Sequence, residues 1–387
     1  MENSNKHKRL LDVLPSPPAG YSGWPWTEEK DPDAYTGFKF LPKISIITPS
    51  YNQGEFIEQT IRSVILQNYP NLEYIVIDGG SNDNTIEIIR KYEKWITYWV
   101  SEKDEGQSHA INKGIEKSTG DIFNWLNSDD YYYKDCFEHL AESFSSDDVY
   151  IVAGNYRFFD NTGESEDKMI DFRLREALEE TIAYVLMNQP STFFRLDKFK
   201  SLGKLDQNLS YVMDQDIWKK YLFRFGQQNI KVIDKDLSNF RFHSKSKTFQ
   251  FLFNNEFNAI YYSIADKAGM TKHKELISRI FSGCNELNYQ FRYEFSQEDK
   301  ILARKAINYF FYLKAKNSFT AGEFDNMKEY LNVIETKYLR DKHKKKIYKL
   351  RIKSFLFKHK LSFILKIFKK PVGLKILLKT YCQSFSF

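Results

Sequence analysis

The chain has 387 residues and a formal net charge of +6, from 57 Lys and Arg against 51 Asp and Glu, which suits one sizeable domain with additional segments. Its three scattered cysteines, Cys136, Cys284 and Cys382, have neither metal-site spacing nor the density of a disulfide framework, as is typical of a reducing cytoplasm. Residues 1–11 are polar and basic and lack the apolar stretch of a secretory signal.

Residues 1–42 are predicted to form an irregular lead-in, because Pro, Gly and Ser interrupt every run from residue 15 onward. Two tryptophans, Trp24 and Trp26, stand in this segment. We expect them to pack the lead-in on the domain that follows.

From residue 43 the pattern alternates between strands and helices. Short apolar runs at 43–47, at 72–77 and from Tyr98 predict strands, and a fourth apolar run follows Gly120. Apolar residues at helical spacing at 55–67 predict a helix there, and further helices are predicted from about Ile86 and through Ala110, Ile111 and Ile115. This alternation indicates right-handed βαβ crossovers, and therefore an α/β domain over residues 43–248 with a mostly parallel, twisted sheet.

A polar loop follows each of these predicted strands, at 48–52, 78–85, 104–108 and 127–130. In parallel sheets, ligands bind outside the carboxyl ends of the strands, so these loops share one candidate site. The first loop lacks a Walker-type Gly-Lys-Ser/Thr and a properly spaced Gly-x-Gly-x-x-Gly. The pattern therefore argues against P-loop NTPases and dinucleotide enzymes.

The fourth loop, Asn127-Ser128-Asp129-Asp130, places two adjacent carboxylates at the end of an apolar strand. Mg²⁺ and Mn²⁺ prefer oxygen ligands and are often held by one or two protein carboxylates, with phosphate oxygens and water completing the shell. The same tetrad in isolation is an ordinary turn or helix-capping run. The three preceding strand–loop units favour the metal interpretation.

A further carboxylate, Asp214, stands just before the apolar residues Ile217 and Trp218. A carboxylate within hydrogen-bond reach of a hydroxyl can take its proton, so Asp214 is a candidate general base. A plain helix N-cap is the alternative explanation. Asp216, two residues on, is predicted to cap or support the helix, and the run 187–194 is predicted to be extended and to face the substrate.

Near the end of this domain, Asn239 to Ser246 carries Arg241 and His243. His243 could bind a metal or a pyrophosphate, and Arg241 could clamp a phosphate. Structural or surface roles are the alternatives for both residues.

Residues 249–340 have helical apolar spacing, with a helical hairpin predicted over 303–333 that turns at Thr320-Ala321-Gly322. The tail at 341–387 is basic and amphipathic: from Lys337 onward, sixteen Lys and Arg accompany one acid, Asp341. No run in the tail reaches the eighteen apolar residues of a spanning helix. The tail is predicted to anchor the protein to anionic lipid, with packing on the domain as the alternative and nucleic acid ranked lowest because no recognition motif is present.

The motifs from Lys43 to His243 resemble the inverting family 2 glycosyltransferases. They include Thr48-Pro49-Ser50-Tyr51-Asn52, Asp78 with Gly80-Ser81, the run from Asp104 to Gly114, and Asn127-Ser128-Asp129-Asp130. The resemblance implies a GT-A-type nucleotide-binding domain followed by a helical region. It also implies a nucleotide-sugar donor, a divalent metal (Mn²⁺ or Mg²⁺) and a glycan or lipid-linked acceptor.

The resemblance assigns roles residue by residue. It places Pro49, Tyr51, Asp78, Gln107, Asn112, Asp129 and Arg241 on the donor, Asp130, Asp129 and His243 on the metal, and Asp214 as the base. Asp129 and Asp130 could exchange roles. Many relatives carry a second acidic residue directly after the one that matches Asp78. This chain has Gly79 at that position. The resemblance still implies a UDP-sugar as the expected donor.

The implied reaction is a single displacement with inversion, in a cytoplasmic protein on the inner face of the membrane. A catalytically silent nucleotide-sugar-binding scaffold and a sugar nucleotidyltransferase are the competing functions. The second would be expected to carry a Gly-rich, Lys- or Arg-bearing first loop, which Thr48 to Asn52 lacks. The similarity to enzymes of bacterial surface-polysaccharide assembly implies, by analogy, a capsule, O-antigen or related glycan as the product.

Overall fold

The computed structural model describes residues 9–159, 165–170, 172–184, 188–243, 253–281, 283 and 287–358. The chain divides into two compact units. The first contains Met1–Leu178, Val185–Ile260 and Phe281–Tyr293, and the second contains Glu179–Tyr184, Tyr261–Ile280 and Glu294–Phe387. The lead-in thus groups with the sheet, and the boundaries proposed from sequence at 248 and 340 stay predictions.

Four parallel strands form the first half of the sheet, in the order β3-β2-β1-β4. They are β1 (Ile44–Ser50), β2 (Leu72–Asp78), β3 (Tyr98–Ser101) and β4 (Ile122–Trp125). Every residue of β1 and β4 is buried, as expected for strands covered on both faces. Ile44 pairs with both Leu72 and Ile122, so these strands end at a common edge.

The second half of the sheet mixes orientations. β8 (Thr192–Arg195) runs antiparallel to β4 and to β6 (Ile151–Phe159), whereas β9 (Ile230–Arg241) runs parallel to β6. The short β5 (Tyr131–Tyr132) and β7 (Ser165–Ile170) pair antiparallel with β9 and β6. The predicted α/β class is confirmed, with the crossover-connected parallel strands in its first half.

The prediction that residues 187–194 are extended holds from Thr192 onward and is wrong for Gln189–Ser191, and the predicted contact with substrate stays a prediction. Gln189–Ser191 form a 3₁₀ turn, and strand β8 begins only at Thr192. Gln189 donates to Trp125 O at 2.7 Å, and Ser191 donates to Asn155 O at 2.7 Å. Both side chains are buried, and their polar groups are satisfied by these backbone carbonyls.

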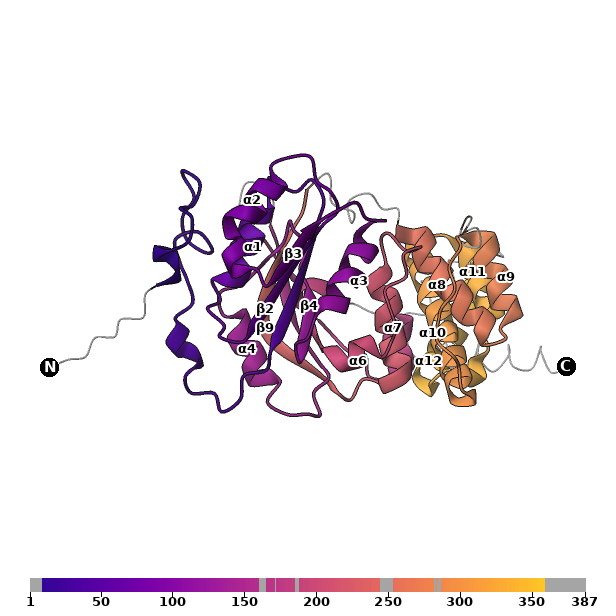
Figure 1. The fold of residues 1–387 in the computed structure, drawn as a ribbon. Helices are drawn as coiled ribbons and strands as arrows, with labels where there is room; N and C mark the ends of the chain where they lie inside the picture. Colours follow the sequence, from indigo (N-terminus) through magenta and orange to yellow (C-terminus); the bar gives the residue numbers. More distant parts are fainter. Residues whose placement is uncertain are drawn as a thin grey trace. The chain divides into compact units, whose positions relative to one another are not determined.

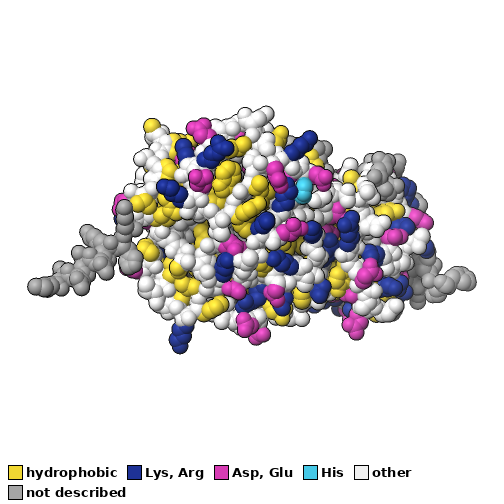
Figure 2. All heavy atoms as spheres, viewed as in Figure 1, with side chains coloured by type: hydrophobic (Ala, Val, Ile, Leu, Met, Phe, Trp, Pro, Cys, Tyr) yellow, Lys and Arg dark blue, Asp and Glu magenta, His cyan; other side chains and the backbone are white. Residues whose placement is uncertain are grey.

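Helices cover both faces of the sheet (Figure 1). One face carries α1 (Ile57–Ile65), α2 (Thr85–Tyr92) and α4 (Cys136–Ser143), and the other carries α3 (Gln107–Lys117), α6 (Leu196–Lys200) and α7 (Met213–Phe225). Three short 3₁₀ turns complete this part, at Leu10–Asp12, Pro32–Tyr35 and Glu93–Trp95. Acidic and basic side chains intermix on the surface seen in Figure 2.

The N-terminal lead-in packs on the sheet domain, as predicted. The fully buried Arg62 of α1 donates to three carbonyls of the lead-in, those of Pro15, Pro25 and Trp26, at 2.9, 3.0 and 2.6 Å. Trp24 Nε1 donates to Tyr132 O at 2.7 Å. Because a buried guanidinium needs acceptors, Arg62 ties this irregular segment to the core.

The second unit is helical. It takes α5 (Leu178–Ala183) from Glu179 onward and α8 (Phe253–Lys267) from Tyr261 onward. Its other elements are α9 (Thr271–Ile280), α10 (Gln297–Ala321), α11 (Phe324–Val333), a 3₁₀ turn at Thr336–Tyr338 and α12 (Asp341–Lys358). Gly322 has φ +79° and ends α10 in the left-handed region that glycine favours. This confirms the predicted hairpin, with α10 starting earlier than expected.

Candidate active site

The first two loops at the carboxyl edge are bound to each other. Asn52 N donates to Ser81 Oγ at 2.7 Å, and Asn82 N donates to Asn52 Oδ1 at 2.9 Å. Asn52 has φ +53°, a conformation that Asn tolerates better than most residues. Pro49 lies in β1. Tyr51, the first residue after that strand, is 58% exposed. The loop therefore presents Tyr51 outward on a rigid base.

Asp78 ends β2 and is completely buried. Its Oδ2 accepts from Gly80 N, Ser81 N and Ser101 Oγ at 3.1, 2.9 and 2.6 Å, and its Oδ1 accepts from Ser81 Oγ. The carboxylate thus holds the loop after β2 against the end of β3. In this arrangement Asp78 shapes the donor-side loop rather than presenting free oxygens.

Gly79, the residue after Asp78, lies close to the side chain of Asp104. A Cβ built on Gly79 would lie 2.7 Å from Asp104 Oδ2, in the loop after β3. Asp104 in turn accepts from Gly106 N at 2.8 Å, just before helix α3. A side chain at position 79 would therefore require the carboxylate of Asp104 to shift.

Gln107 and Asn127 link α3 to the loop after β4. Gln107 Nε2 donates to Asn127 Oδ1 at 2.7 Å, and Asn127 Nδ2 donates to Asp130 Oδ2 at 3.3 Å. This chain of amides leads from the third loop to the acidic pair. The structure thus brings Gln107 beside the fourth loop, and its predicted donor contact stays a prediction.

The two adjacent carboxylates have different surroundings. Asp130 is 1% exposed, and its Oδ1 accepts from Arg241 N at 2.9 Å. Burial, followed by the charge of Asp129, raises the pKa of the Asp130 carboxyl well above its usual value. The side chain of Asp129 is 20% exposed, and its Oδ2 lies 3.1 Å from His243 Nε2. Asp129 is therefore the partly exposed acid, in contact with the buried His243, and Asp130 is the buried acid.

Arg241 fixes this corner of the site. Its guanidinium lies over the rings of Phe56 and Phe159, 4.7 and 4.3 Å from their centroids. It also donates to Asp129 O at 3.0 Å and to Gln59 Oε1 at 2.6 Å. Burial lowers the pKa of the guanidinium. Arg241 thus joins α1, the acidic loop and the end of β9.

Asp129 and His243 are the two side chains that would hold a divalent cation at this site. The carboxylate suits Mn²⁺ or Mg²⁺ when phosphate oxygens and water supply the remaining ligands, whereas the imidazole favours Mn²⁺ over Mg²⁺, which prefers oxygen ligands. Within the described ranges, no three His, Cys, Asp or Glu side chains gather as a complete metal site. A bound cation would therefore depend on the ligands that accompany it.

Asp214 lies in the first turn of α7 and is partly exposed. Its Oδ1 accepts from Gln215 N at 2.8 Å, and burial raises the pKa of its carboxyl to about 6. Asp216 is fully buried, and its two oxygens contact Lys220 Nζ and the Tyr289 hydroxyl, each at 2.6 Å. Asp216 is therefore structural, and Asp214 is the titratable group that remains partly open to solvent.

One phenol reports the relation between the two acidic regions. Tyr156 of β6 has its pKa raised first by burial and then by the negative charges of Asp130 and Asp214. Both carboxylates therefore lie close enough to act on a single side chain.

Asn112 takes a role different from the predicted donor contact. Its Nδ2 donates to Leu205 O, and its Oδ1 accepts from Leu205 N, both at 2.9 Å, while the side chain is 5% exposed. Ser108 Oγ donates to Leu209 O at 3.2 Å. Helix α3 thus holds the segment that leads into α7, so Asn112 contributes to the site indirectly.

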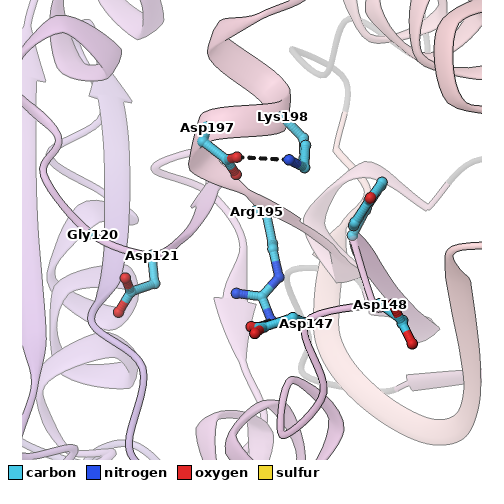
Figure 3. Close-up of a pocket in the computed structure, with 8 residues that line it drawn as sticks. Gly120, Asp121, Asp147, Asp148, Arg195, Asp197 and Lys198 are labelled. Atoms are coloured by element: carbon cyan, nitrogen blue, oxygen red, sulfur yellow. Dashed lines mark hydrogen bonds and ion pairs between the residues drawn. The ribbon is translucent and has the colours of Figure 1, made fainter.

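A separate hollow lies at the opposite edge of the sheet (Figure 3). Its lining comes from the start of β4, the segment before β6 and the end of β8, and consists of Gly120, Asp121, Asp147, Asp148, Tyr150, Arg195, Asp197 and Lys198. Arg195 is held there by Val149 O and Ser146 O, each at 2.9 Å. The hollow lies at the amino ends of the parallel strands, away from the loops described above.

Several residues at the site carried no sequence signal. Phe56 and Gln59 belong to the predicted helix at 55–67, yet nothing in the sequence indicated that they contact Arg241. Tyr156 and Glu256 also went unpredicted; Glu256 accepts hydrogen bonds from the segment before Asp214. Only tertiary contacts between distant segments identify them.

The comparisons with known proteins identify the family. The family model "Glycosyl transferase family 2" matches residues 45–204. An uncharacterized glycosyltransferase of Rickettsia typhi is 32% identical over 196 residues, which cover 47% of this chain and 59% of that protein. An uncharacterized glycosyltransferase of Haemophilus influenzae is 30% identical over 238 residues, covering 58% of this chain and 94% of that protein. The chain belongs to glycosyltransferase family 2.

Among solved structures, S. aureus TarS 1-349 in complex with UDP-GlcNAc matches this family 2 glycosyltransferase with a TM-score of 0.50 and 18% identity. The match covers 76% of this chain and 91% of that one. At this identity the likeness shows the fold alone, and it confirms the GT-A-like prediction.

Proposed function

We propose that this family 2 glycosyltransferase moves a sugar from a nucleoside diphosphate donor to a hydroxyl of a glycan or lipid-linked acceptor, with inversion. The observations that carry the proposal are the match to the family 2 model, the contact of Asp129 with His243 after β4, and the pKa of about 6 of Asp214 at the start of α7. The Asp129–His243 pair can hold the diphosphate and Asp214 can take a proton.

On the donor side, we assign the cation to Asp129 and His243, with Asp130 supporting Asp129 from below. When bound, the cation supplies Lewis-acid stabilisation of the charge that develops on the departing diphosphate. We also assign Tyr51 and Gln107 to the donor, supported by the exposure of Tyr51 and the contact of Gln107 with Asn127, and Asp78 to the shape of the loop after β2. UDP is the proposed nucleotide, supported by the family resemblance and by the UDP-GlcNAc in the TarS structure.

On the acceptor side, Asp214 takes the proton of the incoming hydroxyl. The oxygen of that hydroxyl forms a bond to the anomeric carbon as the bond from that carbon to the diphosphate oxygen breaks. A carboxyl with a pKa of about 6 is ionised at neutral pH and still basic enough to accept the proton. No second carboxylic acid is required, because a nucleoside diphosphate leaves without being protonated by the protein.

Product analysis tests the proposal. Purified protein with UDP-GlcNAc, Mn²⁺ and a lipid-linked glycan pool should release UDP, and EDTA should stop the release until Mn²⁺ is restored. Release of pyrophosphate would instead identify a nucleotidyltransferase. Donor binding without turnover across UDP-, GDP- and dTDP-sugars would identify a silent scaffold.

We also propose that the basic C-terminal segment brings the enzyme to the inner membrane surface. Helix α12 buries His343, Ile347, Leu350 and Ile352 and exposes Lys345, Lys346 and Lys349. Its apolar face is therefore already used, and its lysines support electrostatic attraction to anionic lipid. Among the described helices, none is long and apolar enough to cross a bilayer. Residues 359–387 lie outside the described part.

A further inference from the structure

The turn that presents Asp214 is held by a carboxylate from another helix. Glu256, in the first turns of α8, accepts hydrogen bonds from three consecutive backbone N–H groups, those of Ser210, Tyr211 and Val212, at 2.8, 2.7 and 3.1 Å. Its side chain is buried, with 6% exposed. These donors immediately precede α7, whose first N–H groups lack partners within the helix.

A buried lysine, Lys219, follows Asp214 by five residues on α7. Lys219 of α7 is completely buried, donates to Gln215 Oε1 at 3.1 Å and lies 5.1 Å from the ring centroid of Phe257, the residue after Glu256. Burying an ammonium group is costly unless the site uses its charge. Its electrostatic partners are Asp214 and Asp216, and Asp216 is already paired with Lys220.

We propose that Glu256 and Lys219 are positioning residues for Asp214: Glu256 fixes the turn that carries it, and the two opposite charges hold its carboxylate ready to accept a proton. This inference rests on the proposed role of Asp214 as the base. The charged groups facing Asp214 are Lys219 on its own helix and Glu256 on α8, and the phenol of Tyr156 lies near it on β6.

A purely structural role explains the pair less well. A helix start can be capped by a local Ser, Thr, Asp or Asn, without a carboxylate drawn from 44 to 46 residues away. The methylenes of Lys219 could be replaced by a Leu or Met without burying charge. Burial lowers the pKa of Lys219 to about 7 and raises that of Asp214 to about 6, so each group titrates where enzymes exchange protons.

The two charges predict opposite effects. Removing the negative charge with Glu256→Gln should lower the pKa of Asp214, and removing the positive charge with Lys219→Met should raise it, each by about half a pH unit or more. Lys219→Arg keeps the charge and should leave the titration near that of the parent protein. A structural role alone would weaken folding without producing shifts of opposite sign.

The experiment is a ¹³C NMR titration of the full-length protein with labelled aspartate, in which Asp214→Asn identifies the Asp214 signal. The acidic limb of the pH–rate profile should move in the same directions. Lys220→Met is the matched control, because it removes a neighbouring buried lysine that pairs with Asp216. Circular dichroism and thermal melting establish that each variant is folded.

Two results overturn the inference: folded variants in which the Asp214 signal does not move, or shifts of the same sign for Glu256→Gln and Lys219→Met. If Glu256→Gln does not fold, Lys219→Met compared with Lys219→Arg and Lys220→Met decides alone. The NMR titration does not depend on sugar transfer. A fully active Asp214→Asn enzyme would therefore refute the proposed base while leaving the electrostatic result readable.

Discussion

The backbone N–H of Arg241 donates to the carboxylate of Asp130 across 2.9 Å, although 111 residues separate them in the chain. This bond fastens the end of β9 to the loop after β4. Two residues further, His243 reaches Asp129 rather than Asp130. The relationship gives the adjacent acids different tasks: Asp130 holds the corner together, and Asp129 faces outward.

The first prediction concerns the cation. Asp129→Asn and His243→Ala should each weaken Mn²⁺ binding by about tenfold or more, since each removes one of two protein ligands. Mn²⁺ EPR in the presence of UDP measures this without requiring turnover. Equal Mn²⁺ affinity in both variants and the parent protein would contradict the assignment, and Asp121→Asn at the opposite edge of the sheet is the control.

The second prediction concerns Asp130. Its raised pKa means that the folded state binds a proton more tightly than the unfolded state, so its contribution to stability falls as pH rises above the unfolded value of about 4. Asp130→Asn, melted in EDTA, should therefore gain stability relative to the parent protein from pH 4 to pH 8. A difference in melting temperature that is constant with pH would count against this explanation.

The third prediction concerns the base. Asp214→Asn should fold and bind donor but lose about two to four orders of magnitude in transfer rate. Transfer by the parent enzyme should rise through about pH 6, because the carboxyl must lose its own proton before it can accept another. Initial rates from pH 5 to 8 measure both effects, and Asp197→Asn on the exposed side of α6 is the control. Near-normal turnover by Asp214→Asn would refute the role.

The fourth prediction separates Asn112 from the donor contacts. Asn112→Ala removes both partners of the Leu205 backbone and should cost about 1–3 kcal/mol of folding free energy. Donor affinity should change little, while the transfer rate falls because the segment before α7 loosens. Urea denaturation and calorimetric UDP titration test the two effects, and a large loss of UDP affinity in folded protein would restore the direct role.

The fifth prediction concerns the membrane. Replacing Lys345, Lys346 and Lys349 with Glu should reduce binding to phosphatidylglycerol vesicles, since each lysine near an anionic surface contributes about 1 kcal/mol. Vesicle sedimentation at low and physiological salt measures the loss, with phosphatidylcholine vesicles as the neutral reference. Unchanged sedimentation with intact folding would show that α12 does not carry the attraction.

The sequence by itself determined the strand–helix alternation, because β-branched runs and helical apolar spacing are local properties. It also determined the family and the polar loops at the carboxyl edge, since each loop directly follows its strand. The hairpin of α10 and α11 was equally local, turning where Gly322 permits a left-handed residue.

Only the tertiary structure decided which acid faces outward. Asp129 and Asp130 are indistinguishable in sequence, and their difference depends on a hydrogen bond from Arg241 and the position of His243, both more than 100 residues away. In the same way, only the folded structure shows that the Asn112 amide hydrogen-bonds the backbone of Leu205 and that Glu256 accepts hydrogen bonds from the segment before α7. Side-chain roles depend on what burial leaves unsatisfied, and distant segments supply those partners only when the chain is folded.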